Sequence, residues 1–323
     1  MSDASSSLSG RFEPAAPAAG SAIARNATPS ARYALHLAEA QQVLLKAASQ
    51  FASTAPGTAA TVVQASSLGA EDVVISHIIN SLELDIGIFV LETGALHPET
   101  LSLLEQFKAT SRAPVTVYTP VNASVVQFVA REGTEAMYKS IELRKACCGI
   151  RKMEPLGRAL AGKDAWISGL RREQSGARAE VPLVDTSEPR TKLNPLANWT
   201  WGDVWHYIAE NKVAYNPLHD AFFPSIGCAP CTRAISLGED FRAGRWWWEN
   251  ESAKECGLHV KPHSLAEGQA ALPSDASALV SAQAHVAAGD VKGVPTPGCS
   301  QNESAKECAL HVNPTSALEK APA

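Results

Sequence analysis

The sequence predicts an α/β protein built on a parallel sheet with helices on both faces. Apolar runs of strand length alternate along the chain with segments of helical spacing, which is the pattern of such folds. One run, residues 86–91, is continuously apolar and is typical of a parallel strand that is buried on both faces. Hydrophobic residues make up 45% of the 323 residues, enough to fill a sizeable core.

Four strands are expected, each followed by a turn that contains glycine or polar residues. They cover residues 61–65, 86–91, 115–118 and 165–169. The carboxyl ends of parallel strands meet at one edge of the sheet, where ligands bind in folds of this class. Three segments of interest fall at this edge, at residues 66–72, 92–94 and 169–173.

Helices are expected between these strands and on either side of them. Helical spacing begins at Tyr33, and apolar residues recur at every fourth position over residues 74–82. Pro98 opens a further helix, because the missing N–H of proline costs little in the first turn. Thr200, with Asp203 three residues later, predicts a capped helix start.

The two ends of the chain differ in composition from its middle. Residues 1–30 are rich in Ala, Ser and Pro without the apolar stretch of a secretory signal, and we expect a disordered N-terminus. Residues 263–298 are similarly biased and predict a linker or an extended tail. Residues 250–260 recur at 302–312 with one glycine-to-alanine difference, a duplication too short to build a repeat fold.

Bulk properties exclude several functional classes. The net charge of −5 does not favour general nucleic-acid binding, and no run has the length of a membrane-spanning helix. The seven cysteines are unevenly spaced, unlike a secreted disulfide scaffold, so a reducing cytoplasm is the expected compartment. Homo-oligomerisation is left open.

The cysteines are the most informative residues in the chain. Cys147 and Cys148 are adjacent, Cys228 and Cys231 form a Cys-x-x-Cys pair, and Cys256 stands apart in a polar segment. Four thiolates are the usual complement of an iron–sulfur cluster or a structural zinc ion. The alternative is that these cysteines are buried and unreactive.

Cys256 is the candidate nucleophile. Lys254 and His259 lie close to it in the sequence, and a positive environment lowers the pKa of a thiol and enlarges its thiolate fraction. The alternative, an incidental cysteine in a charged segment, stays open on local sequence alone.

Basic and small residues indicate an anionic ligand. Lys152, Arg171, Arg242 and Arg245 follow predicted strands or flank cysteines, and arginine forks match phosphate and sulfate oxygens. Each of them taken singly is equally explained as a solvated surface charge. At residues 66–69, the hydroxyls and backbone N–H groups of a strand-to-helix turn can cradle a phosphate, although a plain capped turn fits equally well.

Together these motifs resemble the assimilatory adenylyl-sulfate (adenosine 5′-phosphosulfate) reductases, relatives of the phosphoadenylyl-sulfate reductases. The resemblance covers roughly residues 35–262 and rests on residues 66–72, 147–152, 169–175, 228–231 and 255–259. One departure is Glu92, where the family usually has aspartate, which puts the role of that carboxylate in doubt.

The resemblance implies an adenine nucleotide α-hydrolase-like fold and a set of site residues. One 4Fe–4S cluster would be bound by Cys147, Cys148, Cys228 and Cys231, and Cys256 would be the catalytic nucleophile. The implied substrate-binding residues are Ser66, Ser67, Gly69, Lys152, Arg171, Arg242, Arg245 and His259. Residues 31–245 would form the nucleotide-binding and cluster-binding reductase domain, residues 246–262 the catalytic cysteine segment, and residues 263–323 a low-complexity tail.

The implied reaction is the thioredoxin-dependent reduction of adenylyl sulfate to sulfite and AMP, through an S-sulfocysteine on Cys256, in sulfate assimilation. Enzymes that accept phosphoadenylyl sulfate, alone or as well, are the nearest alternative. A nucleotide-adenylating relative of the ATP pyrophosphatases lacks support at the phosphate loop, and a non-catalytic metal-binding protein would leave Cys256 unexplained. Cys308, in the duplicated motif, is expected to be inert, and Cys299 has no assigned role.

Overall fold

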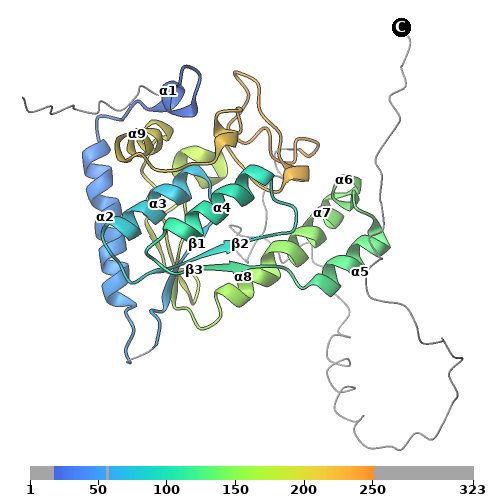
Figure 1. Cartoon of the computed structure of the whole chain (residues 1–323), viewed down its shortest axis with the longest axis horizontal. Helices are drawn as coiled ribbons and strands as arrows, with labels where there is room; N and C mark the ends of the chain where they lie inside the picture. The colour runs from blue at the N-terminus through green and yellow to red at the C-terminus, as the bar shows by residue number, and fades with distance from the viewer. Residues whose placement is uncertain (1–17, 56–57, 251–323) are drawn as a thin grey trace, which may run out of the picture. The chain divides into compact units, whose positions relative to one another are not determined.

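The computed structural model describes residues 18–55 and 58–250, all within one compact unit of the chain. Six strands form one sheet in the order β3-β2-β1-β4-β6-β5, and every neighbouring pair is parallel except β5 with β6 (Figure 1). The predicted parallel α/β sheet is confirmed. The strands are β1 (Val62–Ser66), β2 (Gly87–Leu91), β3 (Val115–Tyr118), β4 (Ala165–Ile167), β5 (Val184–Asp185) and β6 (Thr191–Leu193).

The helices lie between these strands and beyond both ends of the sheet in sequence. In the described residues, the α-helices are α1 (Ala22–Asn26), α2 (Tyr33–Gln50), α3 (Ala70–Ser81), α4 (Pro98–Thr110), α5 (Asn122–Glu132), α6 (Ala136–Lys139), α7 (Ile141–Cys148), α8 (Glu154–Ala159) and α9 (Trp201–Asn211). A π-helical turn, η1 (Gly149–Met153), joins α7 to α8 without a break. Short 3-10 turns include η2 (Arg172–Gln174), η4 (Pro217–His219) and η5 (Ala229–Cys231).

Side chains of the sheet alternate between two cores, so helices cover both faces as predicted. Val62 and Ile88 belong to a large core with residues of α2, α3, α4 and α9. Their neighbours Val63 and Phe89 point the other way and pack with Leu156 of α8. This alternation follows from the two-residue period of a strand.

The predicted helix starts are confirmed. The Thr200 hydroxyl accepts from the Asp203 backbone N–H at 3.0 Å, and the Asp203 carboxylate accepts from the Thr200 N–H at 3.0 Å, so α9 begins with a capping box. Pro98 is the first residue of α4. These caps satisfy backbone donors that a helix start otherwise leaves without partners.

Residues 18–30 differ from the disorder that we expected of residues 1–30. Ala22 in α1 is 1% exposed, and its N–H donates to Asp220 Oδ1 at 2.7 Å. The Arg25 guanidinium donates to the His219 carbonyl at 2.8 Å. The small residues of this segment cannot form a core of their own. They instead let the segment lie closely against the distant loop around residues 219–220, with which it forms hydrogen bonds.

Several predictions fall outside the described residues. These are the remaining part of the N-terminal prediction, Cys256, His259, Cys299, Cys308 and the tail over 263–323. Among the helices that are described, none combines the length and apolar character needed to cross a membrane.

Candidate functional site

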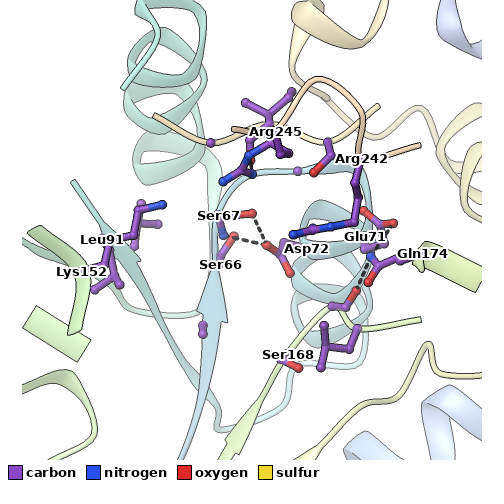
Figure 2. Close-up of a pocket in the computed structure, with 18 of the residues that line it drawn as sticks. Ser66, Ser67, Glu71, Asp72, Leu91, Lys152, Ser168, Gln174, Arg242 and Arg245 are labelled. Atoms are coloured by element: carbon purple, nitrogen blue, oxygen red, sulfur yellow. Dashed lines mark hydrogen bonds between the residues drawn. The ribbon is translucent and has the colours of Figure 1, made fainter. Parts of the chain in front are cut away.

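A cavity of about 210 Å³ opens at the carboxyl ends of β1, β2 and β4, where ligands bind in parallel sheets (Figure 2). We call it the strand-end cavity. Of the eight residues predicted to bind substrate, six line it: Ser66, Ser67, Gly69, Lys152, Arg242 and Arg245. Arg171 does not line it, and His259 lies outside the described residues.

The turn after β1 is held by an internal carboxylate. The Ser67 N–H and hydroxyl both donate to Asp72 Oδ2, at 2.7 and 2.6 Å. Burial raises the pKa of Asp72 to about 6, although these hydrogen bonds lower it. Two of the donors expected to cradle a phosphate, both from Ser67, are therefore engaged by a carboxylate in the first turn of α3.

Two backbone features keep this turn tight. Leu68 is fully buried with φ of 60°, a left-handed conformation that is uncommon for a residue with a side chain. Across the turn, a Cβ on Gly169 would collide with the Asp72 carboxylate and with Glu71. Glycine at the end of β4 is therefore required by the close approach of the acidic residues of α3.

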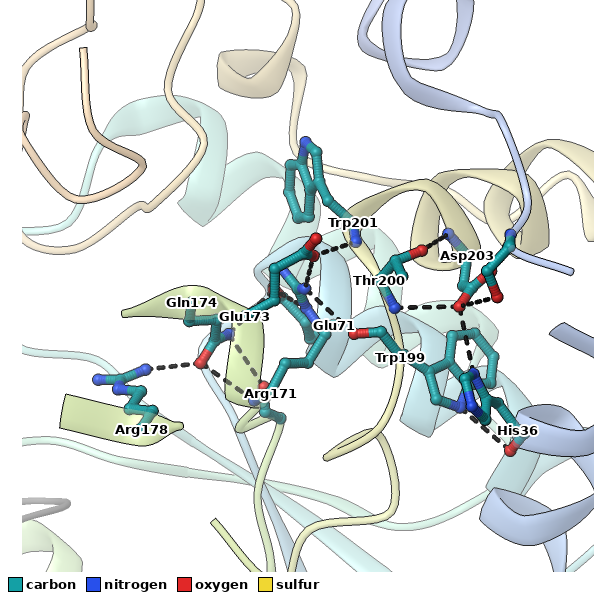
Figure 3. Close-up of polar contacts among 12 residues, drawn as sticks. His36, Glu71, Arg171, Glu173, Gln174, Arg178, Trp199, Thr200, Trp201 and Asp203 are labelled. Atoms are coloured by element: carbon teal, nitrogen blue, oxygen red, sulfur yellow. Dashed lines mark hydrogen bonds and ion pairs between the residues drawn. The ribbon is translucent and has the colours of Figure 1, made fainter. Parts of the chain in front are cut away.

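Arg171 lies beside two residues of the cavity lining, Glu71 and Gln174, without lining the cavity itself; Figure 3 shows its polar contacts. Its guanidinium is 0% exposed and pairs with Glu71 Oε1 at 2.9 Å and with Glu173 Oε2 at 2.7 Å. The Gln174 amide also donates to Glu71 Oε1, at 2.9 Å. Glu71 and Gln174 line the cavity, so Arg171 orients a cavity carboxylate and contributes its charge only indirectly.

Four basic side chains line the strand-end cavity: Lys152, Arg178, Arg242 and Arg245. Arg242 and Arg245 come from the loop after η5, and Arg178 ends the 3-10 turn η3 (Gly176–Arg178). Lys152 lies on η1, on another side of the cavity from Arg242 and Arg245 (Figure 2). Arg245 Nη1 donates to the Ile226 carbonyl at 3.0 Å, and its guanidinium fills the space that a Cβ on Gly227 would need. Cations on more than one side favour an anion with separated charges, such as a nucleotide that carries a sulfate.

His219 is a cavity residue that sequence analysis missed. It is 3% exposed, lines the strand-end cavity, and neither ring nitrogen has a hydrogen-bond partner among the described residues. Burial lowers the pKa of His219 to about 4, so the ring is neutral near pH 7 and offers one donor and one acceptor. A lone histidine among apolar residues gives no sequence signal for this role.

The four clustered cysteines line a second cavity, of about 290 Å³, which we call the cysteine cavity. Cys147 and Cys148 end α7, while Cys228 precedes the short turn η5 and Cys231 is its last residue. The Ala229 N–H donates to the Ala95 carbonyl at 2.8 Å and holds η5 beside the segment after β2. None of the four is in a disulfide within the part of the chain that the structure describes, and the fold brings the two cysteine pairs from distant parts of the chain to one cavity.

The thiols differ in their electrostatic surroundings. Burial raises the pKa of Cys147 and raises that of Cys231 to about 12. For Cys228 burial acts in the same direction, but Lys152 and the Thr93 hydroxyl, 3.3 Å from its sulfur, outweigh it and lower the pKa. Positive charge near Cys228 thus favours the thiolate form of this one cysteine, whereas burial favours the thiol form of Cys147 and Cys231.

The cysteine cavity carries four cysteines, the number of thiolate ligands that an iron–sulfur cluster takes. Within residues 18–55 and 58–250, no three His, Cys, Asp or Glu side chains lie close enough to hold one metal ion. In a 4Fe–4S cluster each iron takes its own thiolate, so the four ligands are spread around a larger group. Arg144, Arg151 and Lys152 also line this cavity and would offset the negative charge of such a cluster.

The two cavities share part of their walls. Lys152 and Trp246 line both of them. Lys152 stands on η1, which continues the helix that ends in Cys147 and Cys148. A π-turn inserted into a helix often marks a functional site, and here it carries the lysine between the cysteines and the strand ends.

Comparisons with known proteins identify what this chain resembles. Residues 61–234 match the family model described as the phosphoadenosine phosphosulfate reductase domain. The chain is 51% identical over 201 residues to the adenosine 5′-phosphosulfate reductase of Allochromatium vinosum, which covers 62% of this chain and 78% of the relative. The corresponding enzyme of Burkholderia cepacia is 52% identical over 198 residues, covering 61% of this chain and 79% of the relative.

A solved structure is also similar. The crystal structure of phosphoadenylyl-sulfate reductase from Candida auris, a phosphate complex, matches with a TM-score of 0.49 and 27% identity. The match covers 59% of this chain and 88% of that one.

Proposed function

The chain belongs to the phosphoadenosine phosphosulfate reductase family, and from this premise we propose that it reduces adenylyl sulfate to sulfite and AMP. Two relatives that are about 50% identical to this chain are named for the substrate without a 3′-phosphate. The chain covers more than three quarters of the length of each. The reaction would serve sulfate assimilation, and so the synthesis of cysteine, in a cytoplasm that keeps the thiols reduced.

One observation carries the proposal: the cysteine cavity adjoins the strand-end cavity through Lys152 and Trp246. A binding place for a nucleotide anion and a place for four thiolates thus share a wall. A non-catalytic metal-binding protein would have no need of the basic cavity beside its metal.

In this proposal one 4Fe–4S cluster would be held by Cys147, Cys148, Cys228 and Cys231. The fit rests on the four cysteines around one cavity and on the cations in its lining. When bound, the cluster would supply a fixed charge distribution beside the substrate, and the electrons for the reaction would come from an external dithiol. The chain's own part is to hold Lys152 on η1, next to the ligating helix.

The substrate anion would bind in the strand-end cavity. Lys152, Arg242 and Arg245 provide donors for its phosphate and sulfate oxygens, and the Ser66, Ser67 and Gly69 turn lies at the end of β1. Neutral His219 is suited to an uncharged polar group of the nucleotide, since it carries both a donor and an acceptor.

The chemical step is assigned to Cys256, which follows the described residues. Its thiolate attacks the sulfur of the nucleotide, the bond between that sulfur and the phosphate oxygen breaks, and AMP leaves. The negative charge on AMP is stabilised by the basic groups of the cavity. The product on the enzyme is an S-sulfocysteine.

A reduced dithiol protein of the thioredoxin type completes the cycle. One of its thiolates attacks the Cys256 sulfur and releases sulfite, leaving a mixed disulfide. Its second thiol then displaces Cys256 as a thiolate. Two electrons pass from the dithiol, so the sulfur of the substrate falls from the sulfate to the sulfite oxidation state.

The first test is an anaerobic preparation assayed for sulfite release with thioredoxin. We expect a brown protein that contains iron and acid-labile sulfide and that prefers adenylyl sulfate to its 3′-phosphorylated form. Activity on the 3′-phosphorylated nucleotide alone would contradict the substrate assignment. A colourless, zinc-containing protein that releases no sulfite would support a metal-binding protein instead.

The chain supplies a matched control for the nucleophile. Cys256 and Cys308 lie in segments that are identical at ten of eleven positions, over 250–260 and 302–312. Cys256→Ser should abolish sulfite release, whereas Cys308→Ser should retain the wild-type rate. The opposite result would place the reaction on the duplicated motif.

A further inference from the structure

Arg144 is a buried charge to which the proposed reaction gives no role. It lies on α7, three residues before Cys147, and its side chain is 0% exposed. It lines the cysteine cavity but not the strand-end cavity. A guanidinium inside a protein needs compensating partners, because an unpaired buried charge is strongly destabilising.

Glu249 is the main partner of Arg144, and its side chain is 3% exposed. The pair is forked: Nε donates to Oε1 at 2.9 Å and Nη2 donates to Oε2 at 2.7 Å. Burial alone would lower the pKa of Arg144, but Glu249 and the neighbouring Cys148 raise it overall, so the group is charged. The ion pair ties α7 to the chain just after Trp246.

Trp246 connects this ion pair to the other cavity. The Arg144 guanidinium lies 4.6 Å from the centroid of the Trp246 ring, and the Arg245 guanidinium lies 4.7 Å from the same centroid. The backbone N–H of Trp246 donates to the Cys231 carbonyl at 3.2 Å, and the φ of Trp246 is 41°. Such a conformation persists in a bulky residue only where its surroundings fix it.

The orientation of Arg245 depends on this contact. Its described hydrogen bond is the one from Nη1 to the Ile226 carbonyl, and its buried Nε has no partner within the described residues. Packing against the Trp246 ring therefore does much to aim the guanidinium into the strand-end cavity.

We propose that Arg144 is a positioning residue for the strand-end cavity: with Glu249 it fixes the Trp246 ring, and the ring fixes Arg245. The inference rests on the proposed function, because a sulfate-bearing nucleotide is the ligand that Arg245 would bind. Arg144 thereby couples the helix of the cysteine pair to anion binding without touching the anion.

Two variants separate this role from simple charge compensation. Arg144→Lys keeps the charge but loses the planar group that packs over the indole and forks to Glu249. The double variant Arg144→Met with Glu249→Leu removes both charges and leaves no unpaired buried ion. Arg158→Lys is the control, since Arg158 pairs with Glu154 and lies over the Tyr118 ring at 5.8 Å, but at the surface.

The measurement is the Kd of adenylyl sulfate by calorimetry, with Cys256→Ser present in every protein so that the first chemical step is blocked, and with iron content and Tm recorded for each. We expect both Arg144 variants to keep their iron and to bind about tenfold more weakly, while the control is unchanged. Wild-type affinity in the double variant would overturn the proposal, as would a loss of affinity that only follows lost iron.

Failure of the proposed function gives a different result. If the wild type does not bind adenylyl sulfate, the same proteins are titrated with inorganic phosphate. Weaker phosphate binding in both Arg144 variants than in the wild type would still support the positioning role, and equal binding would refute it.

Discussion

The strand-end cavity and the cysteine cavity share two wall residues but are built by different means. The first is built around the sheet, because the residues at the carboxyl ends of β1, β2 and β4 form one part of its lining, while η1 and the loop after η5 add basic side chains. The second forms where α7 meets the η5 turn, far from it in sequence. The comparison teaches that a regular sheet positions polar groups by its periodicity, whereas the cysteine cavity depends on a few specific contacts between loops.

The largest effect, on iron content and sulfite release, is expected from Cys228→Ser. This change should impair the cysteine cavity and leave the strand-end cavity intact. Serine keeps the size of the side chain but removes a thiolate ligand. We expect iron content and sulfite release to fall on the order of a hundredfold or more, while AMP still binds at the strand ends.

Iron and sulfide analysis and the visible spectrum measure the loss of the cluster. Calorimetry with AMP measures whether the nucleotide still binds. Cys299→Ser, in the segment outside the described residues, is the control. A Cys228→Ser protein with full iron content would mean that the cavity is not the cluster site.

In the strand-end cavity we expect an effect of intermediate size, on the pH dependence of folding stability. The cavity contains two groups whose pKa values are shifted in opposite directions. Burial raises the pKa of Asp72 from 3.8 to about 6 and lowers that of His219 from 6.5 to about 4. Each shift corresponds to about 3 kcal/mol between protonation states. As pH falls from 6.5 to 4, protonation of Asp72 stabilises the folded protein, while neutral His219 is increasingly costly.

The two effects nearly cancel in the wild type and are separated by substitution. In Asp72→Asn, the free energy of unfolding should fall by about 3 kcal/mol between pH 6.5 and 4, relative to the wild type. In His219→Phe it should rise by a similar amount over the same range. Urea unfolding at several pH values measures both, and parallel curves for all three proteins would contradict the assignment.

The smallest expected effect is a change in folding stability on substitution of Gly169, which lies close to α3 at the strand ends. Gly169→Ala would drive a Cβ into the Asp72 carboxylate, so we expect a loss of about 1–3 kcal/mol of folding stability. Gly157→Ala in α8, where a Cβ meets nothing within 4 Å, should instead stabilise by about 0.5–1 kcal/mol. Thermal unfolding gives the Tm of both variants. Equal Tm values would show that the Asp72 segment can move to make room for the added methyl group.

Much of the sheet and of the helix starts could be predicted because regular patterns specify them. The strand at Val115–Tyr118 and the cap at Thr200 were predicted where the structure has them. β5 and β6 are two and three residues long, too short for any periodicity. Such strands are specified by pairing with their neighbours, which the sequence does not display.

The misplaced and missed residues depend on side-chain direction. Arg171 follows β4 as predicted, yet its guanidinium turns inward to Glu71, because that buried carboxylate needs a cation. Arg144 stands on a helix with polar neighbours, a pattern typical of an exposed residue, and becomes buried only because Glu249 meets it from a distant segment. Partners of this kind lie far apart in sequence and leave no local pattern.

The contacts of α1 bear on how the chain can be shortened. From composition alone, residues 1–30 would be removed as a disordered segment. However, Arg25 donates to the carbonyl of His219 and the Ala22 N–H donates to Asp220. The same cut would also take away Ser30, whose N–H donates to Asp203 at 2.7 Å. A chain trimmed at residue 31 would therefore lose the outer support of the loop that carries His219, whereas a cut at residue 18 spares all of these contacts.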